Sequence, residues 1–110
     1  MQNPEVRCNV SVDVLLQTLD GEKLGQVYDV DNMLTSIWPS EDRRFPLLQY
    51  IDPYGDVLFN GSQMNQVIAE LRLLIKGSSS DNQKRLLQDV IDLALRCHRE
   101  PHTFLRFFGD

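Results

Sequence analysis

Three residues near the end of the chain are of types that bind metal ions: Cys97, His98 and His102. The two histidines are four positions apart, a spacing that aligns side chains on one face of a helix. Pro101 lies between them and opposes that alignment, because proline breaks a helix. A structural zinc site needs about four ligands, and only the distant Cys8 could complete this one. We therefore interpret Cys97 as a buried residue and both histidines as surface residues, and predict no metal and no cofactor.

Two aspartates, Asp52 and Asp56, enclose the residues Pro53, Tyr54 and Gly55. Paired carboxylates can hold a metal ion or act as acid and base, but an EF-hand loop needs more oxygen ligands and a terminal glutamate. Asp, Pro and Gly in this order are typical of a tight turn. We interpret the aspartates as turn residues that place Asp52, Tyr54 and Asp56 together at one exposed corner.

Nucleophilic catalysis needs a nucleophile, a base and an orienting group within reach of one another. The candidate groups are Cys8, Cys97, Ser11, His98 and His102. None lies in a nucleophile elbow or a similar motif, and residues 21–25 lack the spacing of a phosphate-binding loop. Both cysteines fall on faces predicted to be buried, where thiols are usually inert. We predict that the protein is not an enzyme; a small hydrolase or metalloenzyme using His98 and His102 is the less favoured alternative.

Alternating apolar residues predict a strand in the first part of the chain. They are Val6, Cys8, Val10, Val12, Val14 and Leu16. A helix from residue 12 to 19 is the competing interpretation, but the valines favour a strand. Asp20-Gly21 predicts a hairpin turn, after which residues 23–30 return as a second strand. Asp29 or Asp31 is predicted to cap a short helix over residues 33–37.

Two long amphipathic helices are predicted in the second half. Apolar residues recur at helical spacing over 64–75 and 86–97, whereas polar residues, Glu70 among them, lie away from the first stripe. The short serine-rich connection predicts that the helices are antiparallel. Leu93 and Leu95 lie off the second stripe, so either that helix is covered on two sides or an apolar strip remains for a partner.

Further strands are predicted at 47–51, around Leu58 and Phe59, and at 103–108, with a polar loop at 40–44. Residues 1–110 therefore predict a single α+β domain. In it, an antiparallel β-sheet carries two long antiparallel helices packed on one face.

The chain is acidic, with a net charge of −5. Residues 1–55 hold nine acidic and four basic residues, and residues 56–110 hold seven of each. This balance disfavours nucleic-acid binding and could attract a basic protein, although a merely solvated surface is the alternative. No apolar run approaches the ~18–20 residues that span a membrane. The first residues lack the order of a signal peptide, so a cytoplasmic location is expected.

Residues 46–71 resemble the signature of a family of small uncharacterised bacterial proteins. An immunity-type role is one role that this resemblance suggests. The resembling residues are Asp52-Pro53-Tyr54-Gly55-Asp56, Phe59-Asn60, Gln63-Met64 and Glu70-Leu71, with His102, Leu105, Phe107 and Gly109-Asp110 at the end. The resemblance covers roughly a third of the chain and implies no catalytic residue.

The leading hypothesis is a non-enzymatic, cytoplasmic immunity-type protein that neutralises a toxin domain by occlusion. Its predicted contacts with basic groups are Asp20, Glu22, Asp29 and Asp31, with Trp38 or Tyr54 as the aromatic contact and Asp52 and Asp56 at one edge. The alternative is a structural or regulatory module that forms a homodimer through Leu93, Leu95 and the aromatic C-terminal strand.

Overall fold

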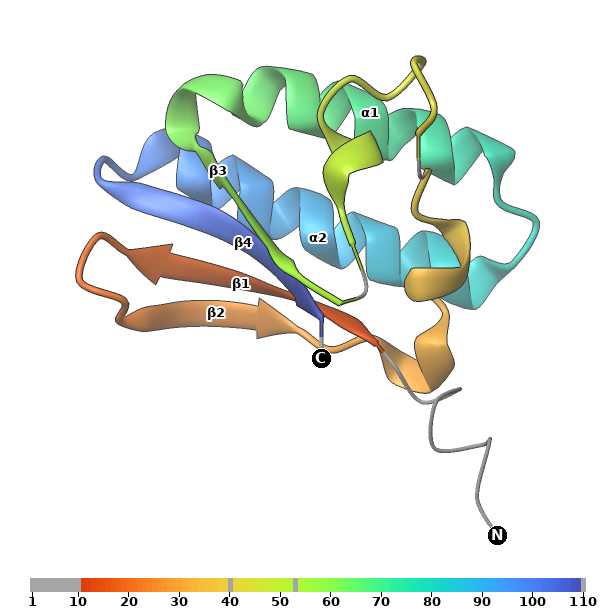
Figure 1. The fold of residues 1–110 in the computed structure, drawn as a ribbon, viewed down its shortest axis with the longest axis horizontal. Coiled ribbons are helices and arrows are strands. Elements are labelled where there is room, and N and C mark those ends of the chain that lie inside the picture. Colours follow the sequence, from red (N-terminus) through yellow and green to blue (C-terminus); the bar gives the residue numbers. More distant parts are fainter. Residues whose placement is uncertain (1–10, 40, 53, 110) are drawn as a thin grey trace, which may run out of the picture.

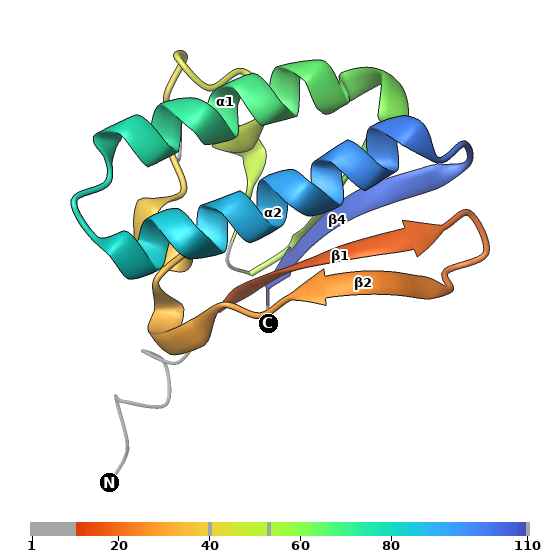
Figure 2. The ribbon, with the colours of Figure 1, turned by 180° about the vertical axis from the view of Figure 1, so that it is seen from behind.

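The computed structural model describes residues 11–39, 41–52 and 54–109 (Figure 1). Their strands are β1 (Val12–Thr18), β2 (Lys23–Val27), β3 (Asp56–Asn60) and β4 (Thr103–Gly109), which form an antiparallel sheet in the order β2-β1-β4-β3. The helices α1 (Met64–Gly77) and α2 (Asp81–Arg99) lie side by side on one face of this sheet (Figures 1 and 2). The predicted α+β fold is confirmed.

The first strand follows the alternating pattern of its residues. Val12, Val14 and Leu16 are fully buried beneath the helices. β4 pairs with β1 along its whole length, from Gly109 opposite Val12 to Thr103 opposite Thr18. The strand interpretation of this segment is therefore confirmed over the competing helix. The predicted beginning of the strand, residues 6–10, lies outside the described residues, and the return strand β2 ends at Val27 rather than at residue 30.

At the start of each long helix, a side chain accepts a hydrogen bond from a backbone N–H group. Asn60 and Gln63 form a reciprocal capping box at the 3₁₀ turn that leads into α1. The Ser80 hydroxyl accepts the N–H of Gln83 at the start of α2. α2 is covered on two sides, because Leu93 is buried and Leu95 packs against the core. Of the two alternatives predicted for this helix, coverage on two sides therefore holds over an exposed apolar strip at Leu93 and Leu95.

The prediction of a strand at residues 47–51 is also wrong. A 3₁₀ turn spans Leu48–Tyr50, and Leu48 is fully buried. Glu70 explains the difference, because its carboxylate accepts the N–H groups of Leu47 at 3.1 Å and Leu48 at 2.8 Å. Glu70 itself has no exposed surface, contrary to its predicted place on the outer face of the helix. A buried carboxylate on α1 thus takes the hydrogen bonds that a strand would have needed.

Candidate protein-binding surface

Asp29 is not available to a partner, which corrects its predicted role in binding. The residue is only 8% exposed. One carboxylate oxygen accepts the N–H of Leu34 at 2.7 Å. The other accepts the N–H groups of Val12 and Thr35, each at 3.1 Å, and the hydroxyl of Thr35. Asp29 therefore joins the end of the β1–β2 hairpin to the 3₁₀ turn Thr35–Ile37, close to the capping role that was predicted for it.

The remaining three acids of the predicted basic-contact set are exposed but separated. Asp20 and Glu22 lie at the turn between β1 and β2. Asp31 lies beyond the other end of β2, in a left-handed conformation with φ of 53° that Asp tolerates better than most residues. A strand of this length spans roughly 20 Å, so the hairpin turn and Asp31 cannot contribute to one small contact. Figure 1 shows the β1–β2 turn and the segment that follows β2 at opposite ends of this strand.

The corner at Asp52, Tyr54 and Asp56 is exposed, as predicted. The Asp52 carboxylate accepts the N–H of Tyr54 at 2.9 Å, and the Asp52 carbonyl accepts the N–H of Gly55 at 3.1 Å. Asp56 pairs with Arg106 of β4 at 2.7 Å. Pro53 lies outside the described residues. Both carboxylates thus hold local structure together, and the Tyr54 ring, 70% exposed, is the part of this corner most open to a partner.

Trp38 belongs to the edge of the core. Its ring lies edge-on against Phe107, with centroids 5.5 Å apart, and is partly buried. The indole N–H is buried and has no hydrogen-bond partner among the described residues. Of the two aromatic residues predicted to contact a partner, only Tyr54 is therefore a freely exposed ring.

The potential metal ligands near the end of α2 do not converge. Cys97 is buried, whereas His98 and His102 are exposed. Within the described residues, no three His, Cys, Asp or Glu side chains gather closely enough to hold a metal ion. Cys8 lies outside those residues.

The Cys97 thiol is expected to react slowly in the folded protein. Burial raises its pKa above the ordinary value of 9.0, although a side-chain hydrogen bond with Thr103 opposes the shift. In a Cys8→Ser variant, iodoacetamide should modify Cys97 much faster in denaturant than in buffer. The free energy of unfolding should fall as the pH rises above about 9, because the unfolded thiol ionises first. A matched Cys8→Ser/Cys97→Ala variant should lose this pH-dependent part, and equal alkylation rates in both states would contradict the assignment.

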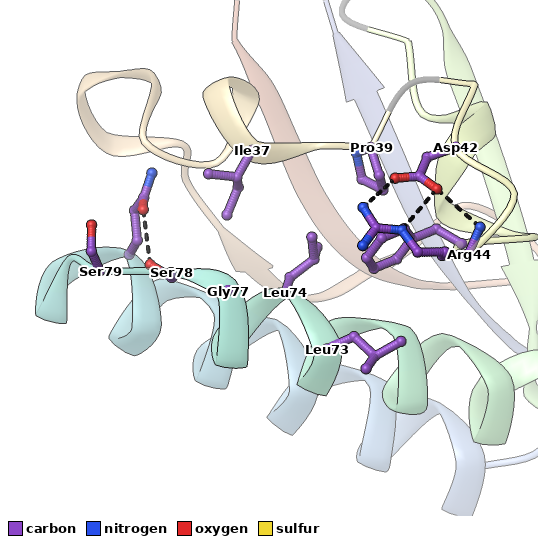
Figure 3. Close-up of a pocket in the computed structure, with 11 residues that line it drawn as sticks. Ile37, Pro39, Asp42, Arg44, Leu73, Leu74, Gly77, Ser78 and Ser79 are labelled. Carbon is purple, nitrogen blue, oxygen red and sulfur yellow. Dashed lines mark hydrogen bonds and ion pairs between the residues drawn. The ribbon is translucent and has the colours of Figure 1, made fainter.

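A hollow of about 400 Å³ lies between the segment 37–45 and the C-terminal end of α1 (Figure 3). Of its described lining residues, only Asp42 and Arg44 are charged, and they pair at 2.8 Å. The hydrogen bond from Arg44 lowers the pKa of Asp42 below its usual value. Of the two serines that line the hollow, Ser78 donates its hydroxyl to the side-chain oxygen of Gln83 at 2.9 Å.

A second hollow, of about 390 Å³, runs between the edge strand β2 and helix α2; we call it the β2–α2 groove. Its lining residues are Gln26, Val27, Tyr28, Val30, Leu86, Asp89, Asp92 and Leu93. An adjoining hollow shares Val30 and Leu86 and extends the groove to Asp31 and Arg85. Tyr28 is 61% exposed and Val30 50% exposed, so this groove holds two exposed apolar side chains.

The charged residues that line the β2–α2 groove itself are acidic, and its extension adds one acidic residue, Asp31, and one basic residue, Arg85. Asp89 and Asp92 are the charged residues among those that line it, and both are exposed. Asp92 accepts a hydrogen bond from Gln88 at 3.1 Å, whereas Asp89 has no partner among the described residues. The combination of exposed apolar side chains and acidic neighbours is suited to a protein segment that carries both basic and apolar residues.

Among the residues that line this groove, Leu93 was the one for which a partner contact was predicted from the sequence. Leu86, Asp89 and Leu93 follow one another at i, i+3 and i+7, which places the aspartate within an apolar row of α2. The sequence contains this pattern, but Asp89 was treated only as one of the seven acidic residues that balance seven basic residues in positions 56–110. Tyr28 and Val30 were assigned to a strand, where their exposure was not foreseeable.

Comparisons of the chain with protein-family models, with curated proteins and with solved structures found no match. The resemblance of residues 46–71 to a bacterial family thus stays a prediction. Within the described residues, no helix combines the length and the apolar character needed to cross a membrane.

Proposed function

We propose that the protein is a non-enzymatic protein-binding domain, most concretely an immunity-type protein that neutralises a toxin domain by covering its working surface. We place this activity in the cytoplasm, where a toxin directed at the cell interior would be met. The free, buried thiol of Cys97 is compatible with a reducing compartment.

The observation that carries the proposal is the β2–α2 groove. Exposed Tyr28 and Val30 supply apolar contact area beside the acids Asp89 and Asp92. Aromatic side chains are frequent among residues that dominate binding energy, and acidic neighbours both select a basic partner and speed its approach. The acids of the hairpin turn, Asp20 and Glu22, lie at the far end of β2 and serve as a comparison surface.

Charge reversal in the groove is expected to abolish protection against the toxin. The candidate toxin is a domain encoded by a gene next to that of this chain, and the two are co-expressed. The wild-type protein should restore growth, whereas Asp89→Lys/Asp92→Lys should not, because each change replaces an attraction with a repulsion. Asp20→Lys/Glu22→Lys is the matched control and should restore growth. Rescue by the groove variant equal to that of the wild type would contradict the proposed surface.

A self-associating module is the second candidate, and one surface favours it. On the sheet face away from the helices, the Arg106 guanidinium lies 4.9 Å from the centre of the Phe108 ring, and its strand partners are Leu15 and Leu58. Phe104 is also partly exposed there. Light scattering separates the candidates: a dimer that becomes a monomer on Phe104→Lys supports self-association, and a wild-type monomer opposes it.

A further inference from the structure

The edge of strand β2 carries backbone groups that point away from the sheet. The Thr18 N–H donates to the Glu22 carbonyl on the β2 side of β1, and the Leu19 N–H donates to the His102 carbonyl on the β4 side. Because N–H groups alternate along a strand, Val14 and Leu16 direct theirs toward β2. Their partners in β2 are Val27 and Gly25.

Gln26, between Gly25 and Val27, therefore directs its N–H and C=O outward. The Leu24 carbonyl also faces away from β1, since it accepts a hydrogen bond from Arg96 of α2 at 3.2 Å. The backbone of Gln26 has no such partner among the described residues. β2 is thus closed by an arginine at one end and open at Gln26, where the β2–α2 groove begins.

An extended segment added beside β2 would use both features at once. Its backbone would exchange hydrogen bonds with Gln26, and every second side chain would point to the helix side of the sheet. On that side lie Leu86 and Leu93, with Asp89 and Asp92 beside them. Leu86 and Leu93 favour apolar side chains in the added segment, whereas Asp89 and Asp92 favour lysine or arginine. The apolar stems of these long basic side chains can lie along the leucines while their charged groups reach the aspartates.

We propose that the β2–α2 groove binds a partner protein by strand addition, accepting an extended segment in which every second residue faces the helix side of the sheet and these residues are alternately basic and apolar. This inference rests on the proposed protein-binding function and specifies its mode: the backbone of Gln26 supplies hydrogen bonds, while Asp89 and Asp92 select basic side chains. The segment becomes a fifth strand of the described sheet, next to β2.

The test uses the full chain and a synthetic peptide, acetyl-Lys-Thr-Val-Thr-Lys-Thr-Val-amide, which presents lysine and valine on one face. Binding is followed by amide NMR at peptide concentrations up to about 1 mM. Wild-type protein should bind it, and hydrogen exchange at the Gln26 N–H should slow at least about tenfold near saturation. A peptide with proline at its central position keeps the charge but cannot extend the sheet, and should bind at least about tenfold more weakly.

Two substitutions at position 26 distinguish the contribution of the backbone to binding from that of the side chain. Gln26→Pro removes the outward N–H and is tolerated on an edge strand, so it should weaken binding at least about tenfold. Gln26→Ala keeps the N–H and should bind as the wild type does. Exchange at Gln26 in the wild-type complex gives an answer even if Gln26→Pro fails to fold.

The outcomes distinguish this mode from the proposed function itself. If Asp89→Lys/Asp92→Lys abolishes peptide binding but both peptides bind equally and exchange at Gln26 is unchanged, strand addition is wrong and the acidic binding surface stands. If neither peptide binds, the groove does not accept this class of segment and strand addition is overturned; the growth assay with the toxin then still decides the function.

Discussion

Replacing Asp29 with alanine is expected to lower the free energy of unfolding by about 3–5 kcal/mol. The change removes a carboxylate that accepts hydrogen bonds from Val12, Leu34 and Thr35. Two of these donors, the N–H groups of Val12 and Leu34, are buried, and a buried N–H without a partner costs roughly 1–3 kcal/mol. The Val12 N–H keeps a second acceptor, the Thr35 hydroxyl at 3.0 Å. The affected contacts join the hairpin to the turn that follows it. Chemical denaturation followed by circular dichroism measures the loss.

Two further variants isolate the cause. Asp29→Asn keeps one acceptor oxygen but turns an amide NH₂ toward the same donors, so its loss should be smaller than that of alanine. Asp31→Asn changes an exposed neighbour in a conformation that asparagine tolerates, and should alter stability by less than about 0.5 kcal/mol. A loss below about 1 kcal/mol in Asp29→Ala would show that the carboxylate does not hold these elements together.

Replacing Glu70 with alanine is expected to cost about 3 kcal/mol, the second-largest effect. Glu70 is fully buried, and its carboxylate accepts from Leu47, Leu48 and the side chain of Gln66. Its loss leaves the N–H groups of the 3₁₀ turn unpaired beside the core. Hydrogen exchange should accelerate at Leu47 and Leu48 before it does so in the sheet.

Gln66→Ala is the matched control for Glu70→Ala. It removes one hydrogen bond, of 2.7 Å to the carboxylate, from an exposed residue. The expected loss is about 1 kcal/mol, with exchange at Leu47 and Leu48 unchanged. Equal losses in the two variants would contradict the proposed role of the buried carboxylate.

Periodicity was sufficient to predict the architecture of the described residues. The alternating residues of β1 and the stripes of α1 and α2 reflect burial of one face, and that signal lies in the local sequence. The caps at Asn60 and Ser80 are equally local features, since each requires only a side-chain oxygen a few positions from the N–H it accepts.

The errors arose where tertiary contacts overrode local preference. Residues 47–51 have strand-like composition, but a carboxylate more than 20 positions away takes their N–H groups. Asp29 belongs to an acidic surface by composition, yet its oxygens accept hydrogen bonds from two separate segments, β1 and residues 34–35. The β2–α2 groove joins residues about 60 positions apart, and its existence depends on β2 being an edge strand. Strand order of this kind is not encoded in any single window of the sequence.

The central claim is that this chain acts by binding another protein, and calorimetric titration of the purified chain with the candidate toxin domain tests it most directly. We expect a one-to-one complex with a dissociation constant of about 1 μM or lower. The affinity should fall at least about tenfold in Asp89→Lys/Asp92→Lys and stay unchanged in Asp20→Lys/Glu22→Lys. Absence of a complex at micromolar concentrations would contradict the claim, and equal binding by both variants would contradict its assignment to the β2–α2 groove.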